Sequence, residues 1–138
     1  MLRLINTAKR LLTVYYGCKG LEHPRRATHL TVSSSYVFPA ELIINAKSFH
    51  TSASHPIYNL ELQFFGARNA LARKIIPLFP LKHVREYTIE WLDVFTDDCL
   101  SLFRRMKGLL HLRLDSMDVE PVLYALDLID EGVHREVT

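Results

Sequence analysis

The stretch MKGLLHLRL, residues 106–114, carries apolar side chains at spacings of three, three and two. These side chains are Met106, Leu109, Leu112 and Leu114. The stretch LKHVREYTI, residues 81–89, has the same pattern 25 residues earlier. Its apolar residues are Leu81, Val84, Tyr87 and Ile89. A repeat of this length with an LxxLxL core predicts units of one strand and one helix that stack into a solenoid.

Weaker copies of the pattern continue upstream and extend the prediction to the whole chain. We expect one α/β domain over residues 1–138, built from four to five irregular repeats, with parallel strands on the concave face and helices on the convex face. The predicted strand cores lie near residues 2–4, 29–33, 59–63, 86–90 and 111–115. No terminal repeat has the polar outer surface of a cap, which favours a part of a longer array.

The segments between the strand cores have helical features, as crossovers between parallel strands require. Pro39 suits a first helical turn, and Leu42, Ile43 and Ala46 follow at helical spacing. Residues 67–79 predict a helix that Pro77 ends or distorts, and Thr96 is a candidate cap for the next helix. Leu123 and Leu126 join Val122 in the buried stripe expected of the last one. Residues 47–56 are expected to form a surface loop, and residues 130–138 a frayed end.

Polar residues alternate with the core positions in four of the predicted strands. Alternate side chains of a strand point to opposite faces, so the pattern predicts a sheet with one dry face and one wet face. The wet face would be the concave binding surface of a solenoid, although solubility alone also requires polar side chains there. From the best-matched copies, the candidate partner-binding residues are Glu61, Glu86, Thr88, Glu90, His111, Arg113 and Asp115. Because four of these are acidic, we expect a basic or mixed-charge protein segment as the partner.

Composition sets broad limits on function. The net charge is only +2, which gives no overall reason to expect nucleic acid. No apolar run approaches the roughly 18 residues of a membrane span. The two cysteines, Cys18 and Cys99, have no metal-ligand spacing and imply no disulfide framework. We therefore expect an intracellular protein of the cytoplasm or nucleus.

No catalytic, cofactor or metal site is predicted. Cys99 follows Asp98 at a predicted helix start, where a thiol pKa can be lowered, but a small buried packing residue is the preferred interpretation. His29 and His111 share the wet face, yet the solenoid separates them by three strands, roughly 14 Å, which is too far for one ion. There is no glycine-rich phosphate loop. Neither an enzyme nor a small-molecule substrate is expected.

The phrases LKHVREYTIEWLDV (81–94) and MKGLLHLRLDSMDVEPVLYAL (106–126) resemble the leucine-rich repeats of F-box proteins from mushroom-forming fungi. The resemblance covers about residues 55–130 and is weaker before them. Standard repeats carry an asparagine where this chain has Ser35, Phe65, Leu92 and Met117, and the fungal arrays depart there too. The resemblance implies a substrate-recognition module of a ubiquitin ligase. The F-box segment that defines this family is not visible in the chain.

The first 26 residues support a different hypothesis. They carry six lysines and arginines against Glu22, a net charge of +5. Such a segment could associate with nucleic acid or with an acidic membrane surface, and Tyr15 and Tyr16 add aromatic character typical of single-strand binders. Residues 1–20 are also basic, amphipathic and free of acids, as a mitochondrial presequence is.

Overall fold

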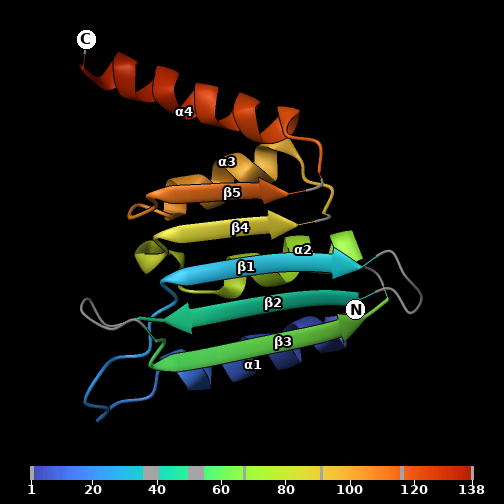
Figure 1. Ribbon diagram of the computed structural model, residues 1–138, viewed down its shortest axis with the longest axis vertical. Coiled ribbons are helices and arrows are strands. Elements are labelled where there is room, and N and C mark those ends of the chain that lie inside the picture. Colours follow the sequence, from blue (N-terminus) through green and yellow to red (C-terminus); the bar gives the residue numbers. More distant parts are fainter. Residues whose placement is uncertain are drawn as a thin grey trace.

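The protein folds around one five-stranded sheet, seen face-on in Figure 1. The computed structural model describes residues 2–35, 41–49, 55–66, 68–90, 92–115 and 117–137. The strands are β1 (His29–Ser35), β2 (Glu41–Ser48), β3 (Tyr58–Phe65), β4 (Glu86–Glu90) and β5 (His111–Asp115). The α-helices are α1 (Leu2–Tyr16), α2 (Arg68–Ile75), α3 (Thr96–Arg105) and α4 (Glu120–Val137), and the short 3-10 helices are η1 (Ile76–Leu78) and η2 (Leu81–His83).

The strand order is β3-β2-β1-β4-β5, and the sheet is mixed. β1, β2 and β3 form an antiparallel meander. β4 and β5 then continue the sheet from the other side of β1, parallel to it. The solenoid prediction is therefore wrong, although the chain is of α/β class. A solenoid adds each repeat beside the preceding one, whereas here β4 skips two strands and pairs with β1.

The second half of the chain folds as two strand–helix units, close to the repeat pattern. β4 and β5 pair in parallel with Tyr87 opposite Leu112, at the predicted offset of 25 residues. Acidic residues begin α3 and basic residues end it, which complements the helix dipole. Thr96 is the first residue of this helix and not its cap.

The first predicted strand, residues 2–4, is instead the start of helix α1. Ala8 and Leu12, four residues apart, are buried, and Ile5 packs against the same core. This spacing places the three side chains on one stripe of a helix. A strand of three residues would have left Ile5, Ala8 and Leu12 without a common buried face, so burial favours the helix.

The largest local error is β2, which was predicted as a helix. Leu42, Ile44 and Ala46 are fully buried and alternate with partly exposed neighbours. β-branched Ile43 and Ile44 favour a strand over a helix. Only five residues separate β1 from β2, too few for the crossover that a parallel pair needs, so the two strands pair antiparallel.

The helix predictions hold better near α2 than near the C-terminus. Helix α2 ends at Ile75, before Pro77, which lies in η1. Helix α4 extends to Val137, so the frayed end predicted at 130–138 is wrong up to that residue. Val122 is buried on α4, but Leu123 and Leu126 are exposed. The predicted loop at 47–56 begins within β2, and its residues 50–54 lie outside the described residues.

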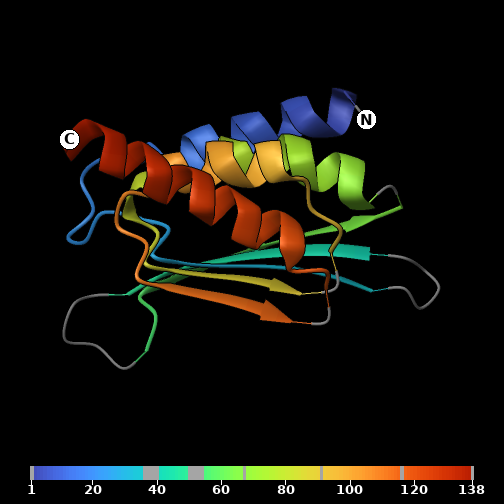
Figure 2. The same cartoon turned by 90° about the horizontal axis from the view of Figure 1, so that it is seen from above.

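The four α-helices of the described residues lie on one side of the sheet, as the edge-on view of the sheet in Figure 2 shows. The core fills the space between this helical layer and the sheet. Its largest fully buried side chains include Tyr87, Phe79, Leu30 and Ile44. The opposite face of the sheet has no helix over it in the described part of the chain (Figure 2). This arrangement leaves the wet side of the sheet open, and we refer to it as the open face.

Candidate functional site

The open face is the first candidate site, because strand pairing sets its side chains in ordered rows. The following rows run from β3 across the sheet toward β5. The first row is Asn59, Lys47, His29, Glu86 and His111. The second row is Glu61, Asn45, Thr31, Thr88 and Arg113. The third row is Gln63, Ile43, Ser33, Glu90 and Asp115. The last, shorter row is Phe65, Glu41 and Ser35.

These rows make the open face polar and net acidic. Only Ile43 and Phe65 are apolar among the side chains of the rows. The carboxylates are Glu41, Glu61, Glu86, Glu90 and Asp115, against the firm cations Lys47 and Arg113. The chain as a whole has a net charge of +2. The acidic character is therefore local to this face of the sheet.

On the antiparallel half, side chains of the open face bind one another. The Asn45 side chain donates a 2.7 Å hydrogen bond to Asn59 across β2 and β3. Gln63 donates another of 2.7 Å to the carboxylate of Glu41. Such cross-strand pairs stabilise the sheet. The polar side chains Asn45, Asn59, Gln63 and Glu41 are therefore engaged within the sheet itself.

His29 and Glu86 connect the two halves at one edge of the rows. The Nε2 atom of His29 lies 3.3 Å from a Glu86 carboxylate oxygen, and its Nδ1 atom lies 2.9 Å from the Thr28 hydroxyl. Burial lowers the pKa of His29, and Glu86 opposes this effect, while Lys47 adds to it. Because the net pKa shift is downward, we treat the contact at neutral pH as a polar contact of a neutral imidazole and not as an ion pair.

The structure groups most of the predicted binding residues but not all of them. Thr88, His111 and the other candidates on β4 and β5 form one contiguous patch. Glu61 lies on β3, at the opposite edge of the sheet and roughly 19 Å from Arg113 at the usual strand spacing. The predicted helix with Leu42, Ile43 and Ala46 at helical spacing hid Glu41, Asn45 and the neighbouring Lys47. Their alternation with buried residues was the missed signal. Pro39, predicted in the first turn of that helix, lies outside the described residues.

The two histidines of the open face are closer than the solenoid predicted. His29 and His111 have only β4 between them, so their strands are separated by roughly 10 Å. Glu86 stands between them in the same row. Even so, the described residues include no group of three His, Cys, Asp or Glu side chains that could hold a metal ion.

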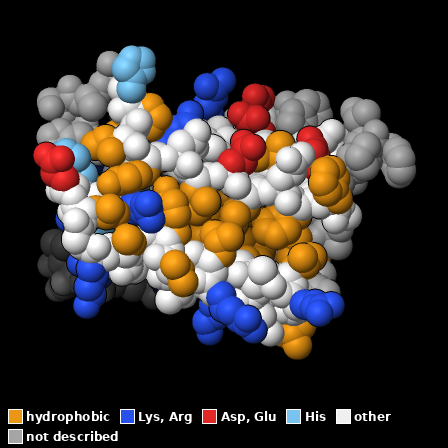
Figure 3. All heavy atoms as spheres, turned by 90° about the horizontal axis from the view of Figure 1, so that it is seen from below, with side chains coloured by type: hydrophobic (Ala, Val, Ile, Leu, Met, Phe, Trp, Pro, Cys, Tyr) orange, Lys and Arg blue, Asp and Glu red, His pale blue; other side chains and the backbone are white. Residues whose placement is uncertain are grey.

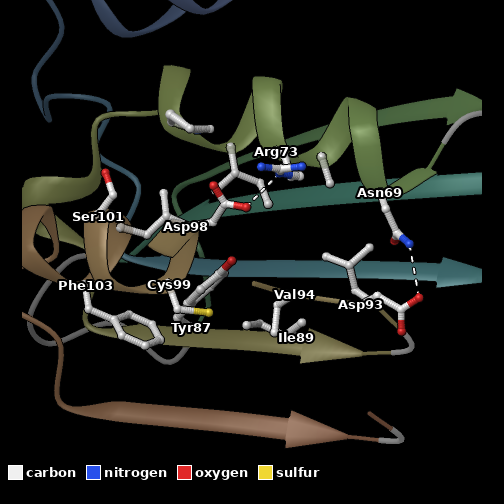
Figure 4. A pocket seen from close by; sticks show the side chains of 15 residues that line it. Asn69, Arg73, Tyr87, Ile89, Asp93, Val94, Asp98, Cys99, Ser101 and Phe103 are labelled. Atoms are coloured by element: carbon white, nitrogen blue, oxygen red, sulfur yellow. Dashed lines mark hydrogen bonds and ion pairs between the residues drawn. The ribbon is translucent and has the colours of Figure 1, made fainter. Parts of the chain in front are cut away.

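A pocket on the helical side of the sheet is the second candidate (Figure 4). It lies between α2, α3 and β4 and has a cavity volume of about 60 Å³. At its rim the Nε atom of Arg73 lies 2.7 Å from an Asp98 carboxylate oxygen. The guanidinium of Arg73 also stacks over Phe95, 4.6 Å from the ring centre. An engineered cavity of about 150 Å³ binds benzene, so this smaller pocket does not suggest a site for a larger metabolite.

The titratable groups in this pocket are not tuned for nucleophilic chemistry. Burial, with a smaller effect of Asp98, raises the pKa of the Cys99 thiol to about 11. Burial likewise raises the pKa of the Tyr87 hydroxyl. A reactive cysteine needs a lowered pKa and access to solvent. Cys99 has the environment of a structural packing residue, which is the interpretation preferred from the sequence.

No known protein family, curated protein or solved structure matches this chain. The relationship to F-box proteins therefore stays a resemblance carried by residues 81–94 and 106–126. Among the described helices, none is both long enough and apolar enough to cross a bilayer.

Proposed function

We propose that the protein is a recognition module that binds a basic or mixed-charge protein segment on the open face of its sheet. The observation that carries this proposal is the excess of carboxylates in rows that no described helix covers. Charge complementarity of this kind raises association rates and selects partners.

The β4–β5 half of the open face is the favoured contact area. Glu86, His111, Arg113 and Asp115 are exposed there, and Thr88 and Glu90 are half-buried. A few residues near the centre of an interface usually dominate its energy. Arg113 is the residue we expect to matter most, because it is the charged group in the middle row of this half, opposite Thr88.

The F-box resemblance adds a biological setting to this proposal. If the chain is part of such a protein, the open face would hold the substrate of a ubiquitin ligase. We propose the cytoplasm or nucleus as its location, in keeping with the unpaired Cys18 and Cys99. Co-precipitation of a ligase adaptor with the protein expressed from its full reading frame tests this setting. Absence of the adaptor would reject the ligase role and leave the recognition module intact.

The binding test uses charge reversals on opposite sides of the molecule. Glu86→Lys combined with Glu90→Lys should reduce capture of a partner from native lysate at least tenfold, and Arg113→Glu should weaken capture of a mixed-charge segment. Arg104→Glu on α3 is the control, since this exposed residue lies on the helical side. Thermal melts should confirm that each variant folds. Loss of capture with Arg104→Glu alone would place the binding surface on the helices.

Helix α1 supports a second candidate function, association with nucleic acid or an anionic membrane surface. The helix carries Arg3, Lys9 and Arg10 and no acid, and it leaves Leu2 and Val14 more than two-thirds exposed at 71% and 75%. Phosphate-driven binding weakens steeply as salt rises. Binding that is lost between low and physiological salt and that requires Arg3 and Arg10 would favour this function over the open face.

A further inference from the structure

We propose that the β3 edge of the sheet, together with α1, is a docking site for an extended acidic peptide, which adds as a sixth strand. This site is separate from the open face and does not depend on the function proposed for it. Figure 3 views the molecule from this edge and shows apolar side chains gathered along it. We refer to the surface formed by β3 and α1 as the edge groove.

The exposed backbone of β3 is the first argument. β3 is the last strand of the sheet and pairs only with β2, so along its eight residues the other side has no partner strand among the described residues. An edge of this kind offers N–H and C=O groups to another chain. Peptides that bind by strand addition use these groups for affinity and side-chain pockets for specificity.

The apolar side chains of the edge groove are the second argument. Leu60, Leu62 and Phe64 point to the helical side of β3 but remain only half-buried. From α1, Leu4 and Leu11 keep 47% and 43% of their surface exposed. These two residues are seven apart, which places them on the same side of the helix. An added strand would cover both sets with its alternate side chains.

The cations at one end of the edge groove are the third argument, and they specify an acidic partner. Arg25 stacks between Tyr15 of α1 and Tyr58 of β3, with its guanidinium carbon 4.3 and 5.1 Å from the ring centres. Arg10 lines the same surface hollow as Arg25, beside Leu11 and Tyr15. The end of the edge groove near Tyr58 therefore carries two guanidinium groups.

Arg25 has unused hydrogen-bonding capacity. One of its terminal nitrogens donates a 3.3 Å bond to the carbonyl of Tyr15. Its Nε atom is buried and has no hydrogen-bond partner, and no ion pair among the described residues involves it. Leaving a buried donor unpaired costs free energy. Arg25 as a whole is only half-buried, so a carboxylate of a peptide could accept a charge-assisted hydrogen bond from the exposed part of its guanidinium.

The geometry favours a peptide over the other possible occupants of this edge. Symmetric pairing of two β3 strands would bring together two copies of α1, each basic and without acids, and would add like-charge repulsion. A membrane surface would offer the backbone groups of β3 no partner strand, so the free edge would add nothing to the binding. An acidic strand satisfies the backbone, the apolar side chains and Arg25 together. Antiparallel addition would continue the β1–β2–β3 meander and bring the C-terminal end of the peptide to Tyr58.

The test uses a fluorescein-labelled peptide of eight residues, which matches the length of β3. The peptide alternates Thr and Val and ends in Glu-Asp. Saturable binding is expected by fluorescence anisotropy, and exchange of the Tyr58–Phe65 amides should slow when it binds. A peptide ending in Lys-Lys and one with alternate backbone nitrogens methylated should bind at least tenfold more weakly. Equal binding of either control peptide would overturn the proposal.

Variants of the protein test which residues contact the peptide. Arg25→Gln should weaken the acidic peptide about tenfold or more, as for loss of a charge-assisted hydrogen bond. Because Arg25 also holds Tyr15, Arg10→Glu supplies a second variant at an exposed position. Glu86→Lys with Glu90→Lys, on the open face, should leave peptide affinity unchanged. This last result keeps the edge groove distinguishable from the open-face function.

Three outcomes would reject the peptide as the occupant of the edge groove. The first is no saturable binding of the acidic peptide up to millimolar concentration. The second is a dimer, by sedimentation, whose β3 amides are protected without any peptide. The third is binding of phosphatidylserine vesicles that Arg10→Glu abolishes while the acidic peptide fails to compete.

Discussion

At the scale of single residues, the burial of a core side chain in the parallel half of the sheet depends on whether its strand is central or at the edge. Ile89 is 1% exposed on β4, whereas Leu112 on the neighbouring edge strand is only half-buried. The repeat pattern correctly predicted that both side chains face the helices. Core leucines of such a repeat are expected to be nearly fully buried, but Leu112 and Leu114 are only half-buried. The reason is that β5 is the last described strand of the sheet and has a neighbour on one side only.

This difference in burial predicts that truncation to alanine lowers the stability of the protein by different amounts at different positions. Ile89→Ala should lower the free energy of unfolding by about 2–5 kcal/mol through lost transfer energy and a cavity. Leu112→Ala should cost less, since part of its side chain is already in contact with solvent. Arg113→Ala should cost under about 1 kcal/mol. Urea melts measure all three, and equal losses for Ile89→Ala and Arg113→Ala would contradict the register of the sheet.

His29 provides a prediction about pH. Its pKa in the folded protein lies below the usual value of about 6.5, because burial disfavours the charged imidazole. The unfolded chain therefore binds the proton more readily. His29 should not affect stability above about pH 6.5, and it should reduce stability as the pH falls below that value. NMR titration of the ring should give the lowered pKa directly.

Glu86→Gln is the matched variant for this titration. The Glu86 carboxylate raises the pKa of His29 and partly offsets burial, Lys47 and Arg85, which lower it. Removing the negative charge should move the pKa of His29 further down. An upward shift would mean that the Glu86 charge does not act on the imidazole as its position implies.

At the scale of elements, the sequence predicts β1, β3, β4 and β5 with accurate positions but misses α1 and β2. Helix α1 had a readable signal, since Ile5, Ala8 and Leu12 have helical spacing. β2 was harder to recognise because Ile43 is an apolar residue on its open face. That one side chain interrupts the alternation and creates the helical spacing of Leu42, Ile43 and Ala46 by coincidence.

The assignment of β2 as a strand predicts that the neighbouring residues Ile43 and Ile44 differ in how well they tolerate a polar substitution. Ile44 is fully buried between sheet and helices, whereas Ile43 is half-buried on the open face. Ile44→Ser should destabilise the protein by about 3 kcal/mol or more, through the cavity and the buried hydroxyl. Ile43→Ser should cost roughly 1 kcal/mol or less. Thermal or urea unfolding compares the two, and a larger loss for Ile43→Ser would contradict the observed register of β2.

At the scale of the whole molecule, the order of the strands could not be predicted from the repeat. The repeat fixes the offset between β4 and β5, because their side chains are equivalent. It contains no information that β4 pairs with β1, since that contact joins residues far apart in sequence. Recognition of β2 would have shown the meander, because the short β1–β2 connection permits only an antiparallel pair.

The candidate site was predicted only in part, because the order of the strands could not be predicted. Alternation along each strand identified the open face and its polar residues without knowledge of the topology. Which residues become neighbours depends on strand order. Glu61 was therefore grouped with Arg113 but lies at the other edge, and Lys47 next to His29 was missed. The edge groove depends on the packing of α1 beside β3, which no local pattern of residues 2–4 predicted.

The central position of β1 leads to a prediction about cooperativity. In a solenoid each unit contacts only its neighbours, and the ends can unfold separately. Here β1 joins the antiparallel meander to the parallel half, and its Leu30 and Val32 are fully buried. Native-state hydrogen exchange should therefore be slowest in β1 and its neighbours β2 and β4, and fastest in the edge strands β3 and β5.

Val32→Ala tests whether β1 couples the two halves of the sheet. The variant should lower the free energy of unfolding by about 1 kcal/mol or more, and both halves should be destabilised together. Exchange of the most protected amides in β2 and β4 should accelerate by the same factor, as expected when they open only by global unfolding. Leu112→Ala, on β5, is the control that should mainly accelerate exchange in β5. If Val32→Ala accelerated exchange in β2 while β4 remained unchanged, the two halves would open independently. Such a result would mean that the parallel half folds as a repeat unit of its own, despite its hydrogen bonds to β1.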